Sequence, residues 1–168
     1  YWIALGLCLL VKEDVVLIVL PLGVLLSVRG EKRRGLVTAV AGIVAALAGT
    51  FLLMRSLIGV PTRNGWRIPF GGVGGFIKEC FTSPANVLKH LSSDERPAYL
   101  WKMFAPLAFM SFLAPEVVMV SALVLFSNMV STFWYQFHIE YHYSLVAVPA
   151  LVLAVVVGAG RLRGRARH

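Results

Sequence analysis

The stretch LVTAVAGIVAALAGTFLLM, residues 36–54, is the clearest apolar run in the chain and decides its fold class. Thr38 and Thr50 are its only polar residues. A transmembrane helix needs about 20 predominantly apolar residues to cross the hydrocarbon core of a bilayer. The run therefore predicts a membrane-spanning helix, and its small residues, Gly42 among them, allow a neighbouring helix to pack closely.

The composition of the whole chain agrees with a membrane protein. Of its 168 residues, 58% are hydrophobic and 14% are charged, and the mean hydropathy is +0.79. Soluble domains have about 45–50% apolar and about 25% charged residues, so a water-soluble single domain is almost excluded. Cys8 and Cys80 have no spacing typical of a disulfide framework or a zinc site.

Further apolar runs predict an all-α fold, a polytopic transmembrane helical bundle with about five to six spans. The predicted spans are residues 2–11 (truncated), 15–28, 36–54, 101–113, 116–130 and 144–160. The charged triplet Lys12-Glu13-Asp14 separates the first two spans, because three ionisable groups are costly near the bilayer midplane. Since Tyr1 begins inside an apolar run, residues 1–168 are expected to be a single transmembrane domain fragment of a longer protein.

One polar segment interrupts the apolar runs, and it predicts an extracytoplasmic loop of roughly 48 residues, with residues 55–100 as its body. Within it, Ser83 can cap a short surface helix that has Pro84 at its first position. Residues 71–75, GGVGG, lack the spacing of a phosphate-binding or dinucleotide-binding loop. We expect an ordinary mobile loop there, with a lid over a lipid-facing site as the alternative.

The excess of basic residues predicts an orientation. The formal net charge is +8, of which the turn at residues 29–35 carries +3 and the tail at residues 161–168 carries +4. The predicted spans place both segments on one side, and short basic segments stay cytoplasmic. The net charge of +4 over residues 55–102 opposes this orientation but is spread along a long segment. Because the charge is a topology signal, no nucleic-acid partner is expected.

The triplet at residues 12–14 is the first candidate for chemistry. Glu13 and Asp14 could act as a general base or as metal ligands, and Lys12 could pair with a phosphate oxygen. The alternative is an interfacial lysine beside two solvated acids. Arg63 and Arg67 are candidates for neutralising the phosphate of a lipid carrier, and contact with anionic headgroups is their alternative.

A second candidate lies in the aromatic and polar segment at residues 133–143. His138, Glu140 and His142 could bind a divalent metal ion, because the two histidines fall at i and i+4 if the segment is helical. The order of the HExxH zinc motif is absent. The alternative is an interfacial belt, in which aromatic rings lie at the level of the lipid headgroups.

Three stretches resemble a known family. They are LLVKEDVVLIVLPLGVLL (residues 9–26), LAPEVVMVSALVLFSNMVS (113–131) and HYSLVAVPALVLAVVVGAGRL (142–162). Together they are similar to the C-terminal part of the bacterial membrane-protein family called domain of unknown function 2079. That family resembles the GT-C superfamily of polytopic glycosyltransferases. The most specific elements are the charged triplet and the pair His142-Tyr143.

The resemblance implies a protein of the bacterial cytoplasmic membrane that transfers a sugar from a polyprenyl-phosphate donor to an acceptor hydroxyl at the extracytoplasmic face. It implies catalytic roles for Glu13, Asp14, His142 and Tyr143. Membrane lipids and the lipid-linked sugar would be the partners, and a divalent metal is a possible cofactor. The acidic first-loop motif of GT-C enzymes would lie upstream of Tyr1.

Two other classes of function fit the same residues. In a transporter or lipid-handling protein, the triplet at residues 12–14 would form an intramembrane relay. In a non-catalytic membrane scaffold, all polar groups would be interfacial anchors. The depth of the triplet in the membrane distinguishes the enzyme from the transporter.

Overall fold

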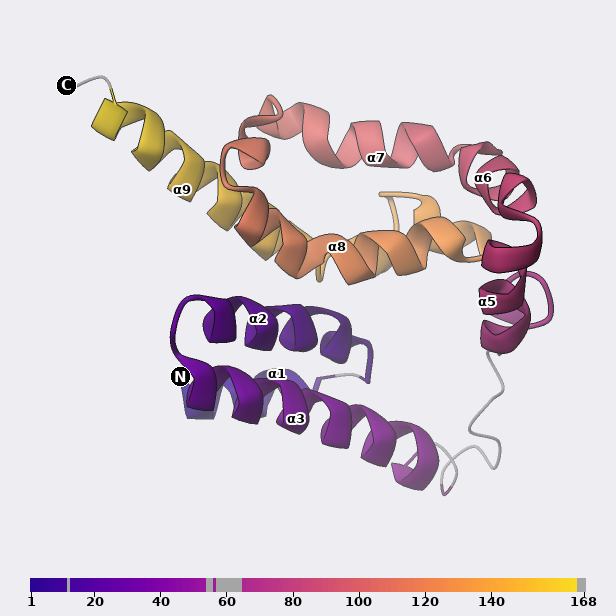
Figure 1. The fold of residues 1–168 in the computed structure, drawn as a ribbon, viewed down its shortest axis with the longest axis horizontal. Coiled ribbons are helices and arrows are strands. Elements are labelled where there is room, and N and C mark those ends of the chain that lie inside the picture. Colours follow the sequence, from indigo (N-terminus) through magenta and orange to yellow (C-terminus); the bar gives the residue numbers. More distant parts are fainter. Residues whose placement is uncertain (12, 54–55, 57–64, 166–168) are drawn as a thin grey trace.

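The computed structural model describes residues 1–11, 13–53, 56 and 65–165. This part of the chain is α-helical with short 3-10 turns and contains no β-strand, so the predicted all-α class is confirmed. Its helices are α1 (Trp2–Leu9), α2 (Val16–Val28), α3 (Lys32–Ala48), α5 (Val73–Thr82), α6 (Pro84–Ser92), α7 (Arg96–Phe104), α8 (Pro115–Val130) and α9 (Val148–Arg165). Helices α2, α3, α8 and α9 run along the molecule, and the α5–α6 hairpin lies at one end (Figure 1).

Helix α3 corresponds to the apolar run that decides the fold class. It continues through a turn of π-helix, Gly49–Leu53. Within the described residues, Lys32–Leu52 is the one helix long and apolar enough to cross a membrane, with a hydropathy of 2.1. Only 17% of its apolar 18-residue window is buried. Helix α3 thus presents apolar side chains outward, as a lipid-facing helix does, whereas the core helix of a soluble protein buries them.

The predicted span at residues 101–113 does not form one helix. Helix α7 ends at Phe104, a 3-10 turn follows, and Ala108 and Phe109 adopt left-handed backbone conformations with φ of 47° and 55°. Pro106 is the physical reason, because it has no N–H to donate and its ring clashes with the carbonyl group one helical turn earlier. The apolar residues of this segment therefore pack as short turns and do not form one continuous helix.

The predicted loop after residue 55 contains two helices in its described part. Helix α6 begins at Pro84 after Ser83, so the predicted surface helix is confirmed. The glycine-rich residues 71–75 are not an ordinary loop, because Gly72 with φ of 98° is the N-cap of α5 and the next glycines are helical. Glycine adopts this left-handed conformation without steric cost, which lets α5 start directly after the chain reversal.

Helices α2 and α3 form a closely packed antiparallel pair. A Cβ atom on Gly23 would lie 2.7 Å from the carbonyl oxygen of Gly35 and 2.8 Å from the amide nitrogen of Ala39. A Cβ on Gly42 would lie 2.9 Å from a methyl carbon of Val19. Small residues thus bring the two backbones nearly into contact, and the predicted packing role of Gly42 is confirmed.

Gly23→Ala is expected to destabilise the protein by about 1–3 kcal/mol, because an added methyl group in a closely packed contact forces the backbones apart. Thermal unfolding of the purified protein in detergent measures the effect. Gly6→Ala in α1 is the matched control, since its added Cβ would meet nothing within 4 Å. Equal melting temperatures for the two variants would contradict the close contact of α2 with α3.

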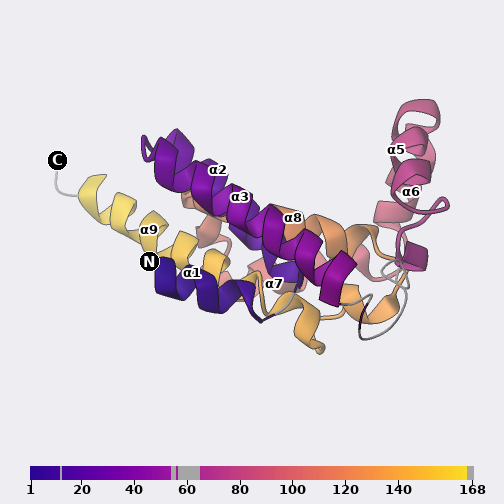
Figure 2. The same ribbon diagram turned by 90° about the horizontal axis from the view of Figure 1, so that it is seen from below.

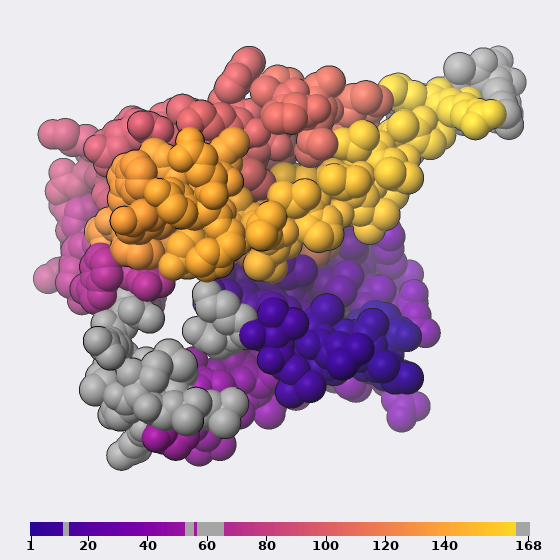
Figure 3. All heavy atoms as spheres, turned by 180° about the vertical axis from the view of Figure 1, so that it is seen from behind, coloured from indigo at the N-terminus to yellow at the C-terminus, as the bar shows by residue number. Residues whose placement is uncertain are grey.

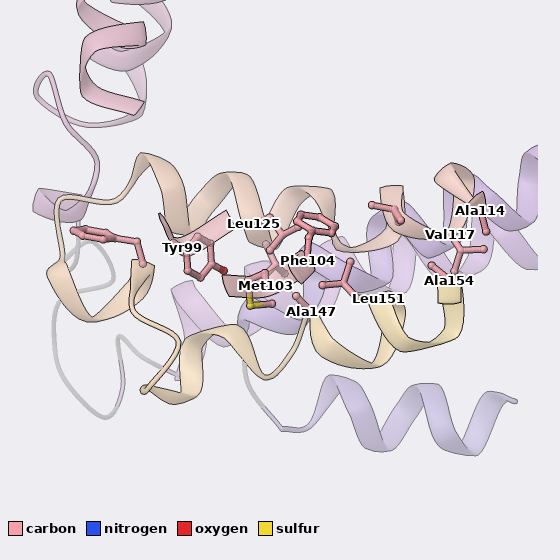
Figure 4. Packing of buried hydrophobic residues seen from close by; sticks show 12 residues of the cluster. Tyr99, Met103, Phe104, Ala114, Val117, Leu125, Ala147, Leu151 and Ala154 are labelled. Atoms are coloured by element: carbon pink, nitrogen blue, oxygen red, sulfur yellow. The ribbon is translucent and has the colours of Figure 1, made fainter. Parts of the chain in front are cut away.

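The buried core lies between α7, α8 and α9, and α2 packs against α8 with Leu17 and Ile18 in contact with this core (Figures 1 and 2). Seen from behind, the C-terminal helices lie above the indigo N-terminal helices (Figure 3). Tyr99 and Phe104 of α7 meet Leu151 of α9 in this core (Figure 4). Ala154 of α9 and Ala147, which directly precedes this helix, are completely buried, so this part of the chain approaches α8 closely.

Three distant segments meet at the end of the bundle where α9 terminates. Arg161 in α9 makes a bidentate ion pair with Glu116 at the start of α8, with Nη2 2.5 Å from Oε1 and Nη1 3.3 Å from Oε2. Arg29, in the turn after α2, approaches the same carboxylate at 3.2 Å. The basic turn at residues 29–35 and the start of the basic tail therefore lie at one end, which agrees with the arrangement expected from the charge pattern.

Candidate functional site

A small cleft with polar side chains in a mostly apolar wall is located between the start of α2, the last turns of α8 and the segment that precedes α9. Its volume is about 60 Å³, enough for roughly four water molecules at one probe sphere each. The lining residues are Asp14, Leu17, Val124, Ser127, Asn128, Gln136, His142, Tyr143 and Val146. The orange and indigo segments that contribute them face each other in Figure 3.

Three residues predicted to be catalytic, Asp14, His142 and Tyr143, line this one cleft. They come from nearly opposite ends of the chain, and α8 lies between them as the common support. Lys12 and Arg63 lie outside the described residues, and so does the side chain of Glu13. The structure thus brings together one carboxylate, one imidazole and one phenol from the predicted set.

Asp14 is positioned by the start of α2. It lies in the 3-10 turn Glu13–Val15, which leads directly into Val16 and the rest of the helix. The N-terminal end of a helix carries a partial positive charge, which favours a carboxylate close to it. Asp14 is half-buried, so its carboxylate belongs to the wall of the cleft.

His142 and Tyr143 are held by stacked rings in a short 3-10 turn, His142–Ser144. Their ring centroids are 4.3 Å apart with nearly parallel planes. Phe133 packs its edge against Tyr143 at 5.9 Å. Aromatic pairs of this geometry contribute about 0.5–1.5 kcal/mol beyond burial alone, so the stack restrains both side chains on the cleft wall.

A buried hydrogen-bond network lies behind the cleft. The Asn128 Nδ2 group donates to the Tyr99 hydroxyl oxygen at 2.9 Å, and the Ser144 hydroxyl donates to the same oxygen at 3.3 Å. Burial raises the pKa of the Tyr99 hydroxyl. Since Ser144 follows Tyr143 directly, the network ties the cleft turn to α7 and α8. The sequence signal for it was Asn128, a single amide in the apolar run of α8.

Arg67, a predicted phosphate-binding residue, does not line the cleft. The Phe133 ring contacts both Arg67 and the cleft residue Tyr143. Thr132 donates its backbone N–H to the Arg67 carbonyl oxygen at 2.7 Å and its hydroxyl to the Trp66 carbonyl oxygen at 2.9 Å. The guanidinium carbon of Arg67 is 4.3 Å from the Phe133 ring centroid, a cation–π contact. Its Nε is buried without a hydrogen-bond partner among the described residues.

The predicted metal site is not assembled. His138 is buried, with Nδ1 3.6 Å from Glu95 and its ring 3.8 Å from that of Trp134, whereas His142 faces the cleft and Glu140 is exposed. The backbone at His138 is extended, so the two histidines do not share a helical face. The described residues contain no group of three histidine, cysteine or acidic side chains that could hold a metal ion.

The aromatic belt was the alternative for residues 133–143, and ring packing dominates this segment. Trp134 contacts Tyr135 and Tyr141 edge to face at 5.2 and 5.8 Å, and the two tyrosines contact each other at 4.6 Å. Trp134 also packs on His138, so His138 belongs to this ring cluster, whereas His142 lines the cleft. Packing between rings therefore overrides the helical spacing on which the metal prediction depended.

Arg96 is a buried residue that sequence reasoning missed. Its guanidinium donates to the carbonyl oxygens of Met129 and Ser131, both at 2.8 Å, and pairs with Asp94. The last carbonyl groups of a helix have no partner within the helix, and Arg96 supplies donors at the end of α8. The Arg96 hydrogen bond lowers the pKa of Asp94. No sequence pattern distinguishes Arg96 from the other basic residues of the same segment.

No curated protein and no solved structure is significantly similar to this chain. Residues 1–167 match the family described as "Predicted membrane protein (DUF2079)". Since this match extends over nearly the whole chain, the protein belongs to the DUF2079 family of predicted membrane proteins.

Proposed function

We propose that this chain is part of a GT-C-like membrane glycosyltransferase that moves a sugar from a polyprenyl-phosphate donor to an acceptor hydroxyl. The observation that carries the proposal is the cleft in which Asp14 meets His142 and Tyr143. General acid–base catalysis requires a group that accepts a proton and a group that donates one or a hydrogen bond. In this cleft, the Asp14 carboxylate can accept a proton and the His142 imidazole can donate a hydrogen bond. The family resemblance supplies the substrate class by analogy only.

The proposed membrane placement has six crossings, formed by helices α1, α2, α3, α8 and α9 and by residues 101–113, which return the chain to the start of α8. Helix α8, with 16 residues, is about 24 Å long at 1.5 Å per residue, somewhat shorter than the roughly 30 Å hydrocarbon core. The end with Arg29 and Arg161 is cytoplasmic in this placement, and the cleft is extracytoplasmic. Asp14 then lies at the membrane surface, which favours an enzyme over a transporter relay at the midplane.

In the proposed step, the acceptor hydroxyl gives its proton to the Asp14 carboxylate while its oxygen forms a bond to the anomeric carbon of the sugar. The bond from that carbon to the phosphate oxygen breaks, and its electron pair leaves with the polyprenyl phosphate. A ring N–H of His142 donates a hydrogen bond to the departing phosphate. Tyr143 stacks on His142 and orients its ring. The described residues do not fit a metal site, so no step is routed through a metal ion.

The size of the cleft limits what enters it. A volume of about 60 Å³ holds the reacting hydroxyl and phosphate oxygens but not a whole glycolipid, so the polyprenyl chain would lie along the lipid-exposed helices. Arg67 is placed behind Phe133 and its guanidinium carries a charge that can attract the phosphate. We assign to Arg67 attraction of the donor and not contact with the reacting atoms.

The direct test is transfer of radiolabelled sugar from a polyprenyl-phosphate donor by the protein reconstituted in liposomes. The proposal expects product only when the donor is accessible from the side opposite to the basic turn at residues 29–35. Orientation is read from protease cleavage of the basic tail in sealed vesicles. Absence of transfer with a panel of hexose and pentose donors, in protein that remains folded, would refute the proposed reaction.

His142→Gln is expected to lower the transfer rate about 10²-fold, the typical effect of removing one hydrogen-bond donor that stabilises developing charge. Glutamine is chosen because it keeps a polar side chain in the cleft wall. Single-turnover transfer at saturating donor measures the chemical step. His90→Gln is the matched control, because His90 bonds the Val130 carbonyl oxygen at 2.8 Å and is not among the lining residues. Equal rates for both variants would remove His142 from the mechanism.

A further inference from the structure

Helix α5 exposes an apolar stripe that its own fold leaves uncovered. Val73, Ile77 and Phe81 are 59%, 52% and 84% exposed. Their spacing of four residues places them on the same face of the helix. We propose that this face of α5 inserts into the lipid bilayer at the cleft end of the bundle, so that α5 is an interfacial helix lying along the membrane surface.

The other faces of α5 either contact neighbouring parts of the protein or carry polar side chains. Phe76 contacts Phe126 of α8 at 6.1 Å and Phe70 at 6.3 Å, ring centroid to ring centroid. On the polar side, Glu79 accepts a hydrogen bond from Asn86 of α6 at 2.6 Å, and Lys78 is exposed. Helix α5 is therefore anchored by one edge, has a polar face, and turns the stripe Val73–Ile77–Phe81 outward.

The direction of α5 fits a position at a membrane surface. The α5–α6 hairpin extends across the end of the bundle in two views at right angles, whereas α3 and α8 run along it (Figures 1 and 2). Helix α3 contains the stretch long and apolar enough to cross a membrane. If α3 crosses the bilayer, a helix that lies across its end runs along the bilayer surface, where amphipathic helices bury their apolar face.

The surface of α8 indicates lipid as the occupant. Met119, Leu123 and Phe126 are 61%, 38% and 49% exposed and share one face of this apolar helix. This row ends at Phe126, the ring against which Phe76 of α5 packs. The exposed apolar surface therefore continues from a proposed transmembrane helix onto α5. One continuous lipid phase covers both surfaces, whereas a protein partner would need a separate site on each.

Insertion of α5 into the bilayer would fix the position of the cleft relative to the membrane surface. The segment just before α5 holds Thr132 through the carbonyl groups of Trp66 and Arg67, and Thr132 leads into the turns that carry His142. Insertion of α5 would set how deeply this segment lies among the lipid headgroups. The inference concerns a lipid contact and does not depend on the reaction proposed above.

The test attaches an environment-sensitive fluorophore to single cysteines. In a background without Cys8 and Cys80, Ile77→Cys and Phe81→Cys report on the stripe, and Thr82→Cys on the polar face of the same helix is the matched control. Each variant is labelled with NBD and reconstituted in vesicles of phosphatidylcholine and phosphatidylglycerol. The NBD emission at residues 77 and 81 should shift to shorter wavelength than at residue 82 and should be quenched by lipids that carry nitroxide groups on their acyl chains.

Two results would overturn the proposal. The first is emission at residues 77 and 81 that matches the label at residue 82 and is quenched by aqueous iodide. The second is a blue-shifted emission that acyl-chain nitroxides do not quench, which would indicate a protein contact such as a second copy of the chain. Val73→Cys gives an independent reading of the stripe if a label at Phe81 prevents reconstitution.

Discussion

Asp14→Asn is expected to lower the rate of sugar transfer about 10³-fold, within the range typical for loss of a general base. Asparagine has the same shape as aspartate but does not accept a proton from the acceptor hydroxyl at neutral pH. Among the side chains that the structure describes, Asp14 is also the one acidic group that lines the cleft. The measurement is single-turnover transfer from a polyprenyl-phosphate sugar in liposomes, with protein folding checked by thermal unfolding.

Glu116→Gln is the matched control, because Glu116 also lies next to the start of a long helix but at the opposite end of the bundle. It pairs with Arg29 and Arg161, whose side chains are 49% and 46% exposed. Ion pairs as exposed as these contribute about 0–1 kcal/mol, so we expect nearly unchanged stability and an unchanged transfer rate. Wild-type transfer by Asp14→Asn would exclude Asp14 as the base.

Arg96→Met is expected to cost roughly 2–4 kcal/mol of stability, because a buried group that loses its hydrogen-bond partner costs about 1–3 kcal/mol. The substitution leaves the carbonyl groups of Met129 and Ser131 without the donors that Arg96 provides. Methionine keeps an unbranched side chain in the space beside Phe137, where the guanidinium now lies. The melting temperature in detergent should fall well below that of the wild type.

Lys89→Met is the control for this loss, because Lys89 is exposed on α6 and such surface changes usually stay within about 0.5 kcal/mol. The pH dependence gives a second check. Arg96 lowers the pKa of Asp94 in the folded protein, so their pairing stabilises the fold above the ordinary pKa of 3.8 and is lost as the pH falls through the lowered value. The gap between Arg96→Met and the wild type should narrow over that pH range. A variant as stable as Lys89→Met would contradict the capping role.

Some of the candidate site could be predicted from the sequence. The resemblance selected Asp14, His142 and Tyr143, but no spacing between residues 14 and 142 indicated that they lie together. Helix α8 brings them into one cleft because α2 and the turn before α9 both pack against its last turns. The metal ligands predicted from the short spacing of His138 and His142 are not grouped among the described residues, because ring packing holds His138 in the aromatic cluster.

The sequence by itself determined the helical class, the apolar character of α3 and the grouping of basic charge, because hydrophobicity and charge act through composition and local periodicity. Only the tertiary structure decided which polar residues share a cleft and that Arg96 holds the end of α8. It also decided that residues 101–113 break at Pro106 and that α5 turns its apolar stripe outward. These features depend on contacts between segments distant in the chain, and such contacts leave no periodic signal in the sequence of either segment.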